Sequence, residues 1–448
     1  MKTWIVVVFA ILFSPYAADA ITLKPEDFGA VVDDGKSDAA AFQAMFNAIP
    51  PLERNVYVVL TSGEYLFDKT VFYPKYNRRR MLIEGNMASI KAVGNAFDLL
   101  TPAGIEGEPV SKALESIDQF IIRNCSFEGG DTQLRIAATL NSEISNCEFV
   151  GGMCGTDLVF CLMARVINTQ YTVFRREGLL VRSGQGDSVT NDGKYFSNAT
   201  GSNSQSNVVT IDGCRFFSAN RAHAGVRNYA SNSMSILNTV FEGLPSKFCV
   251  DYQDRNSTTC TYMYMHNIHI EHPTDTAFTQ ALIRAEQNGG IVHLDGIYSQ
   301  TGRVVQVEAG KSVVKISNWA YFPGASKFKA NGGGEWIFEE NRGLAGIDLG
   351  DPAIWVGKPP YYIGSRFATT LESYSGWSPT LKNGDDYLSL TQGRLLQTYD
   401  SFFDQKNEPF KTPLNLDKYE IADLKTFIMT DPATGKPVSY YLPILKQK

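Results

Sequence analysis

The chain has 448 residues, of which 44% are hydrophobic and 20% are charged, and its net charge at pH 7 is −6. This balance excludes disorder as the main state. The charge also argues against nucleic acid as a partner, because the only dense basic run, Arg78-Arg79-Arg80, is short and is interpreted as a solvated turn.

Residues 1–20 predict a signal peptide that is cleaved after Ala20. Lys2 is followed by an apolar run at residues 5–13, and Ala18-Asp19-Ala20 places small residues where a signal peptidase reads. This run is too short to cross a bilayer, and no later segment is long enough either. We therefore expect a secreted, periplasmic or cell-surface protein without a membrane span.

Residues 38–49 predict an amphipathic helix that caps the open N-terminal end of the fold. Ala41, Phe42, Met45, Phe46 and Ile49 share one helical face, and the preceding Asp38 is placed as the N-cap. Short strands are expected at residues 56–60, 64–67 and 81–84.

A short phrase then recurs along the chain: an aliphatic residue, one spacer, Asn or Gly, a small residue and an aromatic residue. Its Asn or Gly lies at Asn124, Asn146, Asn168, Gly213 and Asn238, with looser copies at Asn267, Gly296 and Asn318. The interval between Asn168 and Gly213 is close to two periods, and residues 189–191 are interpreted as the missing copy.

This period predicts an all-β fold, a right-handed parallel β-helix in which inward side chains of successive coils stack like on like. Asn recurs because it tolerates a left-handed backbone at a tight turn. A β-sandwich with chance spacing is the alternative. We expect residues 21–342 to form the β-helix with its N-terminal capping α-helix.

Residues 343–448 lack the phrase and contain scattered prolines, which predicts an irregular C-terminal region. A terminal cap, an oligomerisation element and a sugar-contacting appendage all remain open. Its aromatic residues, such as Trp355 and Trp377, either stack on sugars or pack over the last coil.

Seven cysteines follow the signal peptide, so at least one thiol is expected to stay unpaired in an oxidising compartment. Cys249 with Cys260 is the first candidate disulfide, and Cys154 with Cys161 is the second. No C-x-x-C spacing indicates a zinc site.

The N-terminal region resembles a known family. Asp27-Phe28-Gly29-Ala30, Asp33-Asp34-Gly35, Asp38 and Ala40-Ala41-Phe42-Gln43 are similar to the N-terminal cap of the pectate-lyase-like superfamily. Ser62-Gly63-Glu64-Tyr65 and Leu82-Ile83-Glu84-Gly85 resemble its next signatures, without the usual proline. The resemblance implies a β-helix that handles polysaccharides, but this cap occurs on lyases, hydrolases, epimerases and virus tail spikes alike.

Members of this family with activity on polysaccharides place their site on the outer side of the central coils. Charged residues are densest in the coils that start at residues 168, 213 and 238. A uronate lyase needs a cation, a base and an acid, and the candidates on one face are Arg221, His223, Arg227 and Tyr229. A hydrolase needs two carboxylates, for which Asp251 and Asp254 are candidates, with Glu177 or Asp187.

Further substrate contacts are expected from neighbouring residues of the same coils. These are Arg175, Arg176, Glu177, Arg182, Tyr252 and Arg255. A solvated polar face of ordinary ion pairs is the alternative interpretation. No metal site is predicted, since His266 and His269 cannot share a strand face. Outward aspartates such as Asp251 and Asp254 are compatible with Ca²⁺, although no calcium loop is recognisable.

The sequence as a whole favours an exported protein that binds an extended, anionic polysaccharide and cleaves it, by β-elimination rather than by hydrolysis. The Gly-His-Gly and Trp-Ile-Asp-His motifs of the pectin-active branches are absent, which argues against pectin. A non-catalytic glycan-binding protein or virus attachment spike is the alternative. A monomer would favour the secreted enzyme, and a homotrimer the spike.

Overall fold

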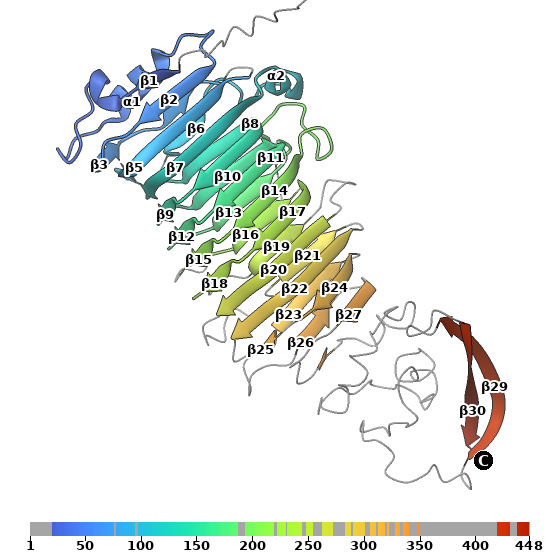
Figure 1. Cartoon of the computed structure of the whole chain (residues 1–448). Coiled ribbons are helices and arrows are strands. Elements are labelled where there is room, and N and C mark those ends of the chain that lie inside the picture. Colours follow the sequence, from blue (N-terminus) through green and yellow to red (C-terminus); the bar gives the residue numbers. More distant parts are fainter. Residues whose placement is uncertain are drawn as a thin grey trace, which may run out of the picture.

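In a computed structural model the chain forms an elongated parallel β-solenoid (Figure 1), which confirms the predicted fold class. The structure describes residues 20–75, 78–94, 97–186, 193–218, 222–229, 231–243, 248–253, 262–271, 283–287, 290–300, 305–310, 312–318, 320–321, 328–331, 335–339, 347–348, 419–430 and 437–447. The predicted signal peptide lies outside this range except for Ala20. The right-handed sense of the coil stays a prediction.

The N-terminal segment contains the predicted helix. Its elements are β1 (Ile21–Leu23), the 3-10 helix η1 (Pro25–Phe28), α1 (Ala39–Asn47), β2 (Asn55–Val59), β3 (Glu64–Phe67) and β4 (Val71–Tyr73). The apolar residues of the predicted helical face are buried, and Phe42 packs edge-on against Tyr65 and Phe67. Asp38 precedes α1, but its carboxylate accepts hydrogen bonds from the backbone N–H groups of Val31 and Leu66 instead of capping the helix. That α1 caps the solenoid stays a prediction.

The basic run at residues 78–80 is not a fully solvated turn, which corrects the prediction. Arg79 is fully buried, and its guanidinium donates hydrogen bonds to the backbone carbonyls of Pro50 and Glu53 at 2.8 and 2.9 Å. These carbonyls belong to the turn after α1, so Arg79 joins that turn to the first coils. Arg78 and Arg80 are exposed.

Each coil lays its strands parallel to those of the coil before it, in columns that run along the solenoid. One column contains β5 (Arg80–Ala92), β7 (Asp118–Glu128), the end of β8 (Thr132–Ser145), β11 (Met163–Ile167), β14 (Ser206–Asp212), β17 (Ser231–Leu237), β20 (Tyr262–Glu271), β22 (Ile291–Gln300), β24 (Val313–Ser317) and β27 (Glu335–Glu339). Another, termed here the site column, contains the start of β8, then β10 (Cys154–Cys161), β13 (Glu177–Arg182), β16 (Ala224–Tyr229), β19 (Phe248–Gln253), β21 (Ile283–Gln287), β23 (Val305–Gly310), β26 (Phe328–Asn331) and β28 (Ile347–Asp348).

A further column contains β3, the ends of β5 and β7, β9 (Glu148–Val150), β12 (Gln170–Thr172), β15 (Arg215–Phe217), β18 (Val240–Glu242), the ends of β20 and β22, and β25 (Ala320–Tyr321). The remaining elements of the solenoid are β6 (Leu100–Pro102), which pairs with β4 and β8, and the short helix α2 (Val110–Glu115).

The Asn and Gly positions of the repeat occupy the turns that the sequence predicts. All have a left-handed backbone, with φ between 47° and 64° at Asn124, Asn146, Asn168, Gly213, Asn238, Asn267, Gly296 and Asn318. Neighbouring turns are also tied together, since the Asn267 side-chain amide donates to Asn238 Oδ1 at 2.8 Å. The Asn or Gly position of the repeat therefore marks each turn and also the contact between turns of neighbouring coils.

The interior is organised by a stack of aromatic rings from the aromatic position of the repeat. Phe127, Phe149, Tyr171, Phe216 and Phe241 lie nearly parallel, with ring centroids 4.9 to 5.1 Å apart. Gly178 packs against this stack: an added Cβ would lie 2.7 Å from Cδ1 of Phe216. At the start of β13, a strand of the site column, the backbone therefore lies directly against the aromatic stack.

The long interval between Asn168 and Gly213 contains one coil and not two, contrary to the prediction. β11 pairs directly with β14, and β12 pairs directly with β15. The extra residues leave the coil after β13 and return at β14, and the expected copy at residues 189–191 lies outside the described residues. Part of this excursion, residues 193–205, lies against the outside of the solenoid.

The cysteines do not form the predicted disulfides. Cys154, Cys161 and Cys249 are free and buried, and so are Cys125, Cys147 and Cys214, while Cys260 lies outside the described residues. Cys161 and Cys249 belong to the hydrophobic core inside the coils. Burial raises the pKa of the Cys249 thiol to about 12, so this thiol is a core side chain and not a reactive group.

In the C-terminal region the structure describes one antiparallel pair, β29 (Tyr419–Thr430) with β30 (Pro437–Gln447). Residues 349–418, with Trp355 and Trp377, lie outside the described residues. In the parts of the chain that the structure describes, no helix has the length and apolar character needed to span a membrane.

Candidate functional site

The outward face of the site column carries a ladder of charged side chains. Equivalent positions of successive strands are Arg135, Asp157, Leu180, Arg227, Asp251, Arg284 and Glu308. Neighbouring parallel strands lie about 4.8 Å apart, so these side chains are within reach of one another. The signs alternate apart from Leu180, which lets each charge pair with a neighbouring coil.

The central part of the ladder brings together several residues that the sequence predicts for a site. We call this group the His223 cluster, and its members are Arg176, Glu177, His223, Arg227, Asp251 and Arg284. Asp251 is its centre, since its carboxylate accepts two hydrogen bonds from Arg284, both at 2.8 Å, and lies 2.5 Å from Nε2 of His223. Burial acts to raise the pKa of Asp251, but the bonds from His223 and Arg284 outweigh it and lower that pKa.

Asp251 is therefore a buried anion that is already surrounded by positive groups. Its side chain is 0% exposed, and Arg227 Nε lies 3.8 Å from Oδ2. This corrects the expectation that Asp251 contributes to a Ca²⁺ site, because the arginines occupy the positions that a cation would need. The structure shows no group of three or more metal-binding side chains among the residues it describes.

Glu177 is the second buried carboxylate of the cluster. It pairs with Arg227 at 3.3 Å and with Arg176 at 2.5 Å, and its side chain is 0% exposed. A carboxylate that acts in glycoside hydrolysis must face the sugar. Neither Glu177 nor Asp251 does so, which removes this pair as the predicted hydrolytic carboxylates.

His223 is held at the surface of the cluster. Its backbone N–H donates to the carbonyl of Arg176 at 2.8 Å, and its ring packs edge-on against Phe248 with centroids 5.5 Å apart. The side chain is 19% exposed. Nε2 of His223 is hydrogen-bonded to Asp251, and within the described residues Nδ1 of His223 has no hydrogen-bond partner. The imidazole is thus fixed in orientation with one nitrogen left for an outside group.

The other predicted residues fall in different places. Arg175 is exposed, and Tyr229 is buried beneath the guanidinium of Arg227, which lies 4.9 Å from the ring centroid. Tyr252 points into the core inside the coils, so it is not a substrate contact; its neighbour Asp251 takes the outward position. The candidates Arg221, Asp254 and Arg255, and also Asp187, lie outside the described residues.

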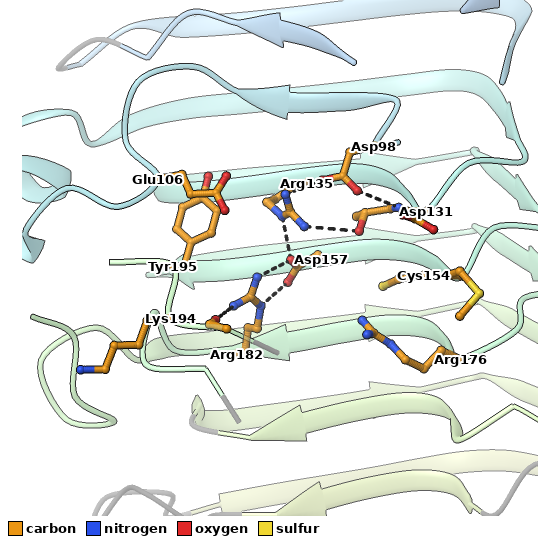
Figure 2. A pocket seen from close by; sticks show the side chains of 13 residues that line it. Asp98, Glu106, Asp131, Arg135, Cys154, Asp157, Arg176, Arg182, Lys194 and Tyr195 are labelled. Carbon is orange, nitrogen blue, oxygen red and sulfur yellow. Dashed lines mark hydrogen bonds and ion pairs between the residues drawn. The ribbon is translucent and has the colours of Figure 1, made fainter. Parts of the chain in front are cut away.

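A polar pocket of about 340 Å³ adjoins this cluster on the outer face (Figure 2). Its charged lining residues are Asp98, Glu106, Asp131, Asp157, Arg135, Arg176, Arg182 and Lys194. Arg176 belongs to both the pocket and the His223 cluster, and it is 34% exposed. The two features therefore form one continuous polar surface.

Asp157 is the buried hub of the pocket. Both its oxygens accept bonds from Arg182 at 2.8 Å, and Oδ2 also accepts from Arg135 Nε at 2.8 Å (Figure 2). Burial acts to raise the pKa of Asp157, but the two guanidinium groups lower it to about 2. Arg135 pairs in addition with Asp98 at 2.5 Å. The ring of Tyr195 lies 5.7 and 5.6 Å from the guanidinium carbons of Arg135 and Arg182.

The excursion between β13 and β14 builds one wall of this pocket. Tyr195, Phe196 and Ala199 pack in a small hydrophobic cluster with residues of α2, β8 and β10, separate from the core inside the coils. This cluster positions Lys194 and Tyr195 at the pocket. The sequence singled out Arg182 but missed Asp98, Arg135, Asp157 and Tyr195. The signal for Arg135 and Asp157 was an opposite charge one repeat apart.

No protein-family model and no curated protein sequence matches the chain. Solved structures are similar to it. The Agl-KA catalytic domain aligns over 75% of this chain and 66% of its own, at 14% identity and a TM-score of 0.43. ORF18 of Geobacillus virus E2 aligns over 72% and 61%, at 13% identity and a TM-score of 0.41.

The A-module of the mannuronan C-5 epimerase AlgE6 from Azotobacter vinelandii aligns over 72% of this chain and 91% of its own, at 12% identity and a TM-score of 0.37. The chain spans less than two thirds of the length of the first two. Because all three TM-scores are below 0.5, the function proposed below is derived from this chain's own side chains.

Proposed function

We propose that the protein is an exported, polysaccharide-processing β-solenoid that cleaves a uronate-containing polymer by β-elimination at the His223 cluster. The observation that carries the proposal is the state of His223. A buried carboxylate holds Nε2 at 2.5 Å, the side chain is 19% exposed, and Nδ1 has no hydrogen-bond partner among the described residues. A histidine oriented by a third group in this way is a candidate general base.

In this mechanism Nδ1 of His223 removes the proton from C5 of the uronate. The electrons of the C5–H bond form the C4=C5 double bond, and the C4–O bond breaks with its electron pair on the leaving oxygen. The imidazolium then returns the proton to that oxygen, which restores neutral His223. Arg176 and Arg284 are partly exposed, at 34% and 15%, and lie on either side of His223 in the cluster, where they stabilise the uronate carboxylate and the charge that builds on it.

Hydrolysis at the same place has less support, because Glu177 and Asp251 are both fully buried and occupied by arginines. Asp251 acts here as a positioning residue: it fixes the imidazole, and Arg284 in turn fixes Asp251. The pocket favours a second candidate, a glycan-binding or spike protein without catalysis, since its side chains present many hydrogen-bonding groups on a rigid face.

The test is to incubate the purified protein with a panel of acidic and neutral polysaccharides and to record ultraviolet absorbance and reducing ends in the same tubes. β-Elimination raises both signals. We expect His223→Ala to lower the rate at least about a hundredfold. His269→Ala is the matched control, because His269 is a partly exposed histidine on β20 outside the site column, and it should leave the rate unchanged.

Asp251→Asn distinguishes the role of Asp251 in orienting the His223 imidazole from its role in the packing of the cluster. It should lower kcat and change the pH profile, because the amide no longer fixes the imidazole, and thermal melting measures its structural cost separately. Reducing ends without absorbance would replace elimination by hydrolysis. Binding without either signal would leave the non-catalytic glycan-binding role.

Export and membership of the pectate-lyase-like superfamily are part of the same proposal, and the residues described under Sequence analysis support them. N-terminal sequencing of the secreted protein should begin at Ile21. Sedimentation equilibrium decides between a monomer, which we propose with the enzyme, and the homotrimer that fits the spike.

A further inference from the structure

The pocket beside the His223 cluster has an unusual charge balance. Four acidic and four basic side chains line it, so its formal charge is near zero. The two sets are not equally available to a ligand, because most of the basic groups are already bound to carboxylates.

Three of the four cations are paired. Arg182 forms a bidentate pair with Asp157, and Arg135 bridges Asp157 and Asp98. Arg176 pairs with Glu177, which lies behind the pocket wall. The pairs of Arg135 and Arg182 are largely buried, with side chains 14% and 6% exposed, so they are structural parts of the wall. Arg176 is 34% exposed and lies at the border with the His223 cluster, where its charge serves the uronate.

The groups left over are mainly acidic. Asp131 is half-buried and Glu106 is exposed, and within the described residues neither carboxylate forms an ion pair or a side-chain hydrogen bond. Lys194 is the corresponding cation, and it is exposed at the rim on the excursion between β13 and β14. Away from Arg176, an anionic sugar in the pocket would therefore meet two carboxylates that form no ion pair among the described residues and one exposed ammonium group.

We infer that this pocket binds an uncharged, hydroxyl-rich sugar residue and rejects a uronate. Carboxylates accept hydrogen bonds from sugar hydroxyls without needing a ligand charge. Through Arg176 the pocket is continuous with the His223 cluster. If the function proposed above holds, the substrate is thus a polymer that carries neutral residues next to uronates, and not a uniform polyuronate.

The experiment measures binding by affinity electrophoresis, in gels that contain each of a panel of neutral polysaccharides and, in parallel, the same polymer oxidised at C6 to uronate. The protein carries His223→Gln so that no cleavage occurs. Asp131→Asn removes one uncompensated charge at nearly constant shape. Glu148→Gln is the control, since Glu148 is an exposed carboxylate on β9 outside the pocket.

We expect the parent protein to bind at least one neutral polymer more tightly than its oxidised form. Asp131→Asn should improve binding of the oxidised form about tenfold and leave the neutral form nearly unchanged, because one like charge within a few ångströms is removed. The effect should shrink with added salt. Glu148→Gln should change neither.

Tighter binding of the oxidised polymer by the parent, or an unchanged ratio in Asp131→Asn, would overturn the inference. Its failure is distinguishable from failure of the proposed function, because the latter is read from absorbance with the unmodified protein. A protein that shows the Asp131 effect but no elimination would keep the neutral-sugar pocket and lose the lyase.

Discussion

Replacing Asp157 by Asn should be among the most destabilising isosteric changes in the solenoid. The carboxylate is 2% exposed and is the shared partner of two arginines from neighbouring strands. An amide keeps the shape, but it cannot accept at both positions, and it leaves Arg135 and Arg182 facing each other without the charge between them. Breaking a buried ion pair by removing one partner costs about 3 to 5 kcal/mol.

Part of this contribution depends on pH with a definite sign. The pKa of Asp157 is lowered to about 2 in the folded chain from an ordinary value of 3.8. A lowered pKa stabilises the folded state above pH 3.8, and the contribution disappears as the pH falls through 2. It amounts to about 2 kcal/mol at neutral pH, of which roughly half remains at pH 3.

The assay is urea denaturation followed by circular dichroism at pH 7 and pH 3. The difference between the unmodified protein and Asp157→Asn should be about 4 kcal/mol at pH 7 and smaller by about 1 kcal/mol at pH 3. The control is Glu242→Gln, which breaks the exposed pair with Arg215 and should cost at most about 1 kcal/mol. Equal losses in the two variants, or a difference that grows in acid, would refute the assignment.

Three further predictions concern the packing of the coils. Gly178→Ala should lower the free energy of unfolding by about 1 to 3 kcal/mol, because its Cβ collides with the aromatic stack, whereas Gly193→Ala, with nothing within 4 Å, should have little effect in the same denaturation assay. Tyr195→Phe should leave stability unchanged or raise it, since the buried hydroxyl has no hydrogen-bond partner among the described residues, while Tyr171→Phe loses a 3.1 Å bond to a threonine hydroxyl and should cost about 1 kcal/mol. The six buried thiols should not react with Ellman's reagent at pH 8 until the protein is unfolded, and early reaction of more than one thiol per chain would contradict their burial, since only Cys260 lies outside the described residues.

The fold was accessible from the sequence because the solenoid repeats its local chemistry. Each turn needs a left-handed residue, so Asn or Gly returns at a constant position, and each coil needs one ring for the stack. The apolar face of α1 was equally plain from its helical spacing. The pairing of strands far apart in the sequence could not be predicted. The interval before Gly213 is an example, because its length fits either two coils or one coil with an excursion, and only the strand pairing distinguishes them.

The candidate site was accessible only in part. Alternation along a strand predicted one outward face for Arg221, His223, Arg227 and Tyr229, of which the structure brings His223 and Arg227 to Asp251. It could not show that Arg227 and Asp251 neutralise groups in the next coil, because the register between coils is a property of the stacked strands. The prediction that Tyr252 contacts substrate was wrong for the same reason, because a shift of one residue along a strand moves a side chain from the surface to the core.

The excursion between β13 and β14 makes the pocket wall a separable part of the molecule. Its anchoring residues, such as Phe196, pack in a cluster of their own, while β11 to β14 and β12 to β15 pair as though the excursion were absent. The coil and the wall therefore have different structural requirements: the coil depends on the register of its strands, and the wall depends on its packing over α2, β8 and β10. A different loop between β13 and β14 that keeps these apolar anchors is therefore expected to change the surface of the pocket while the strand pairing of the rod beneath it stays the same.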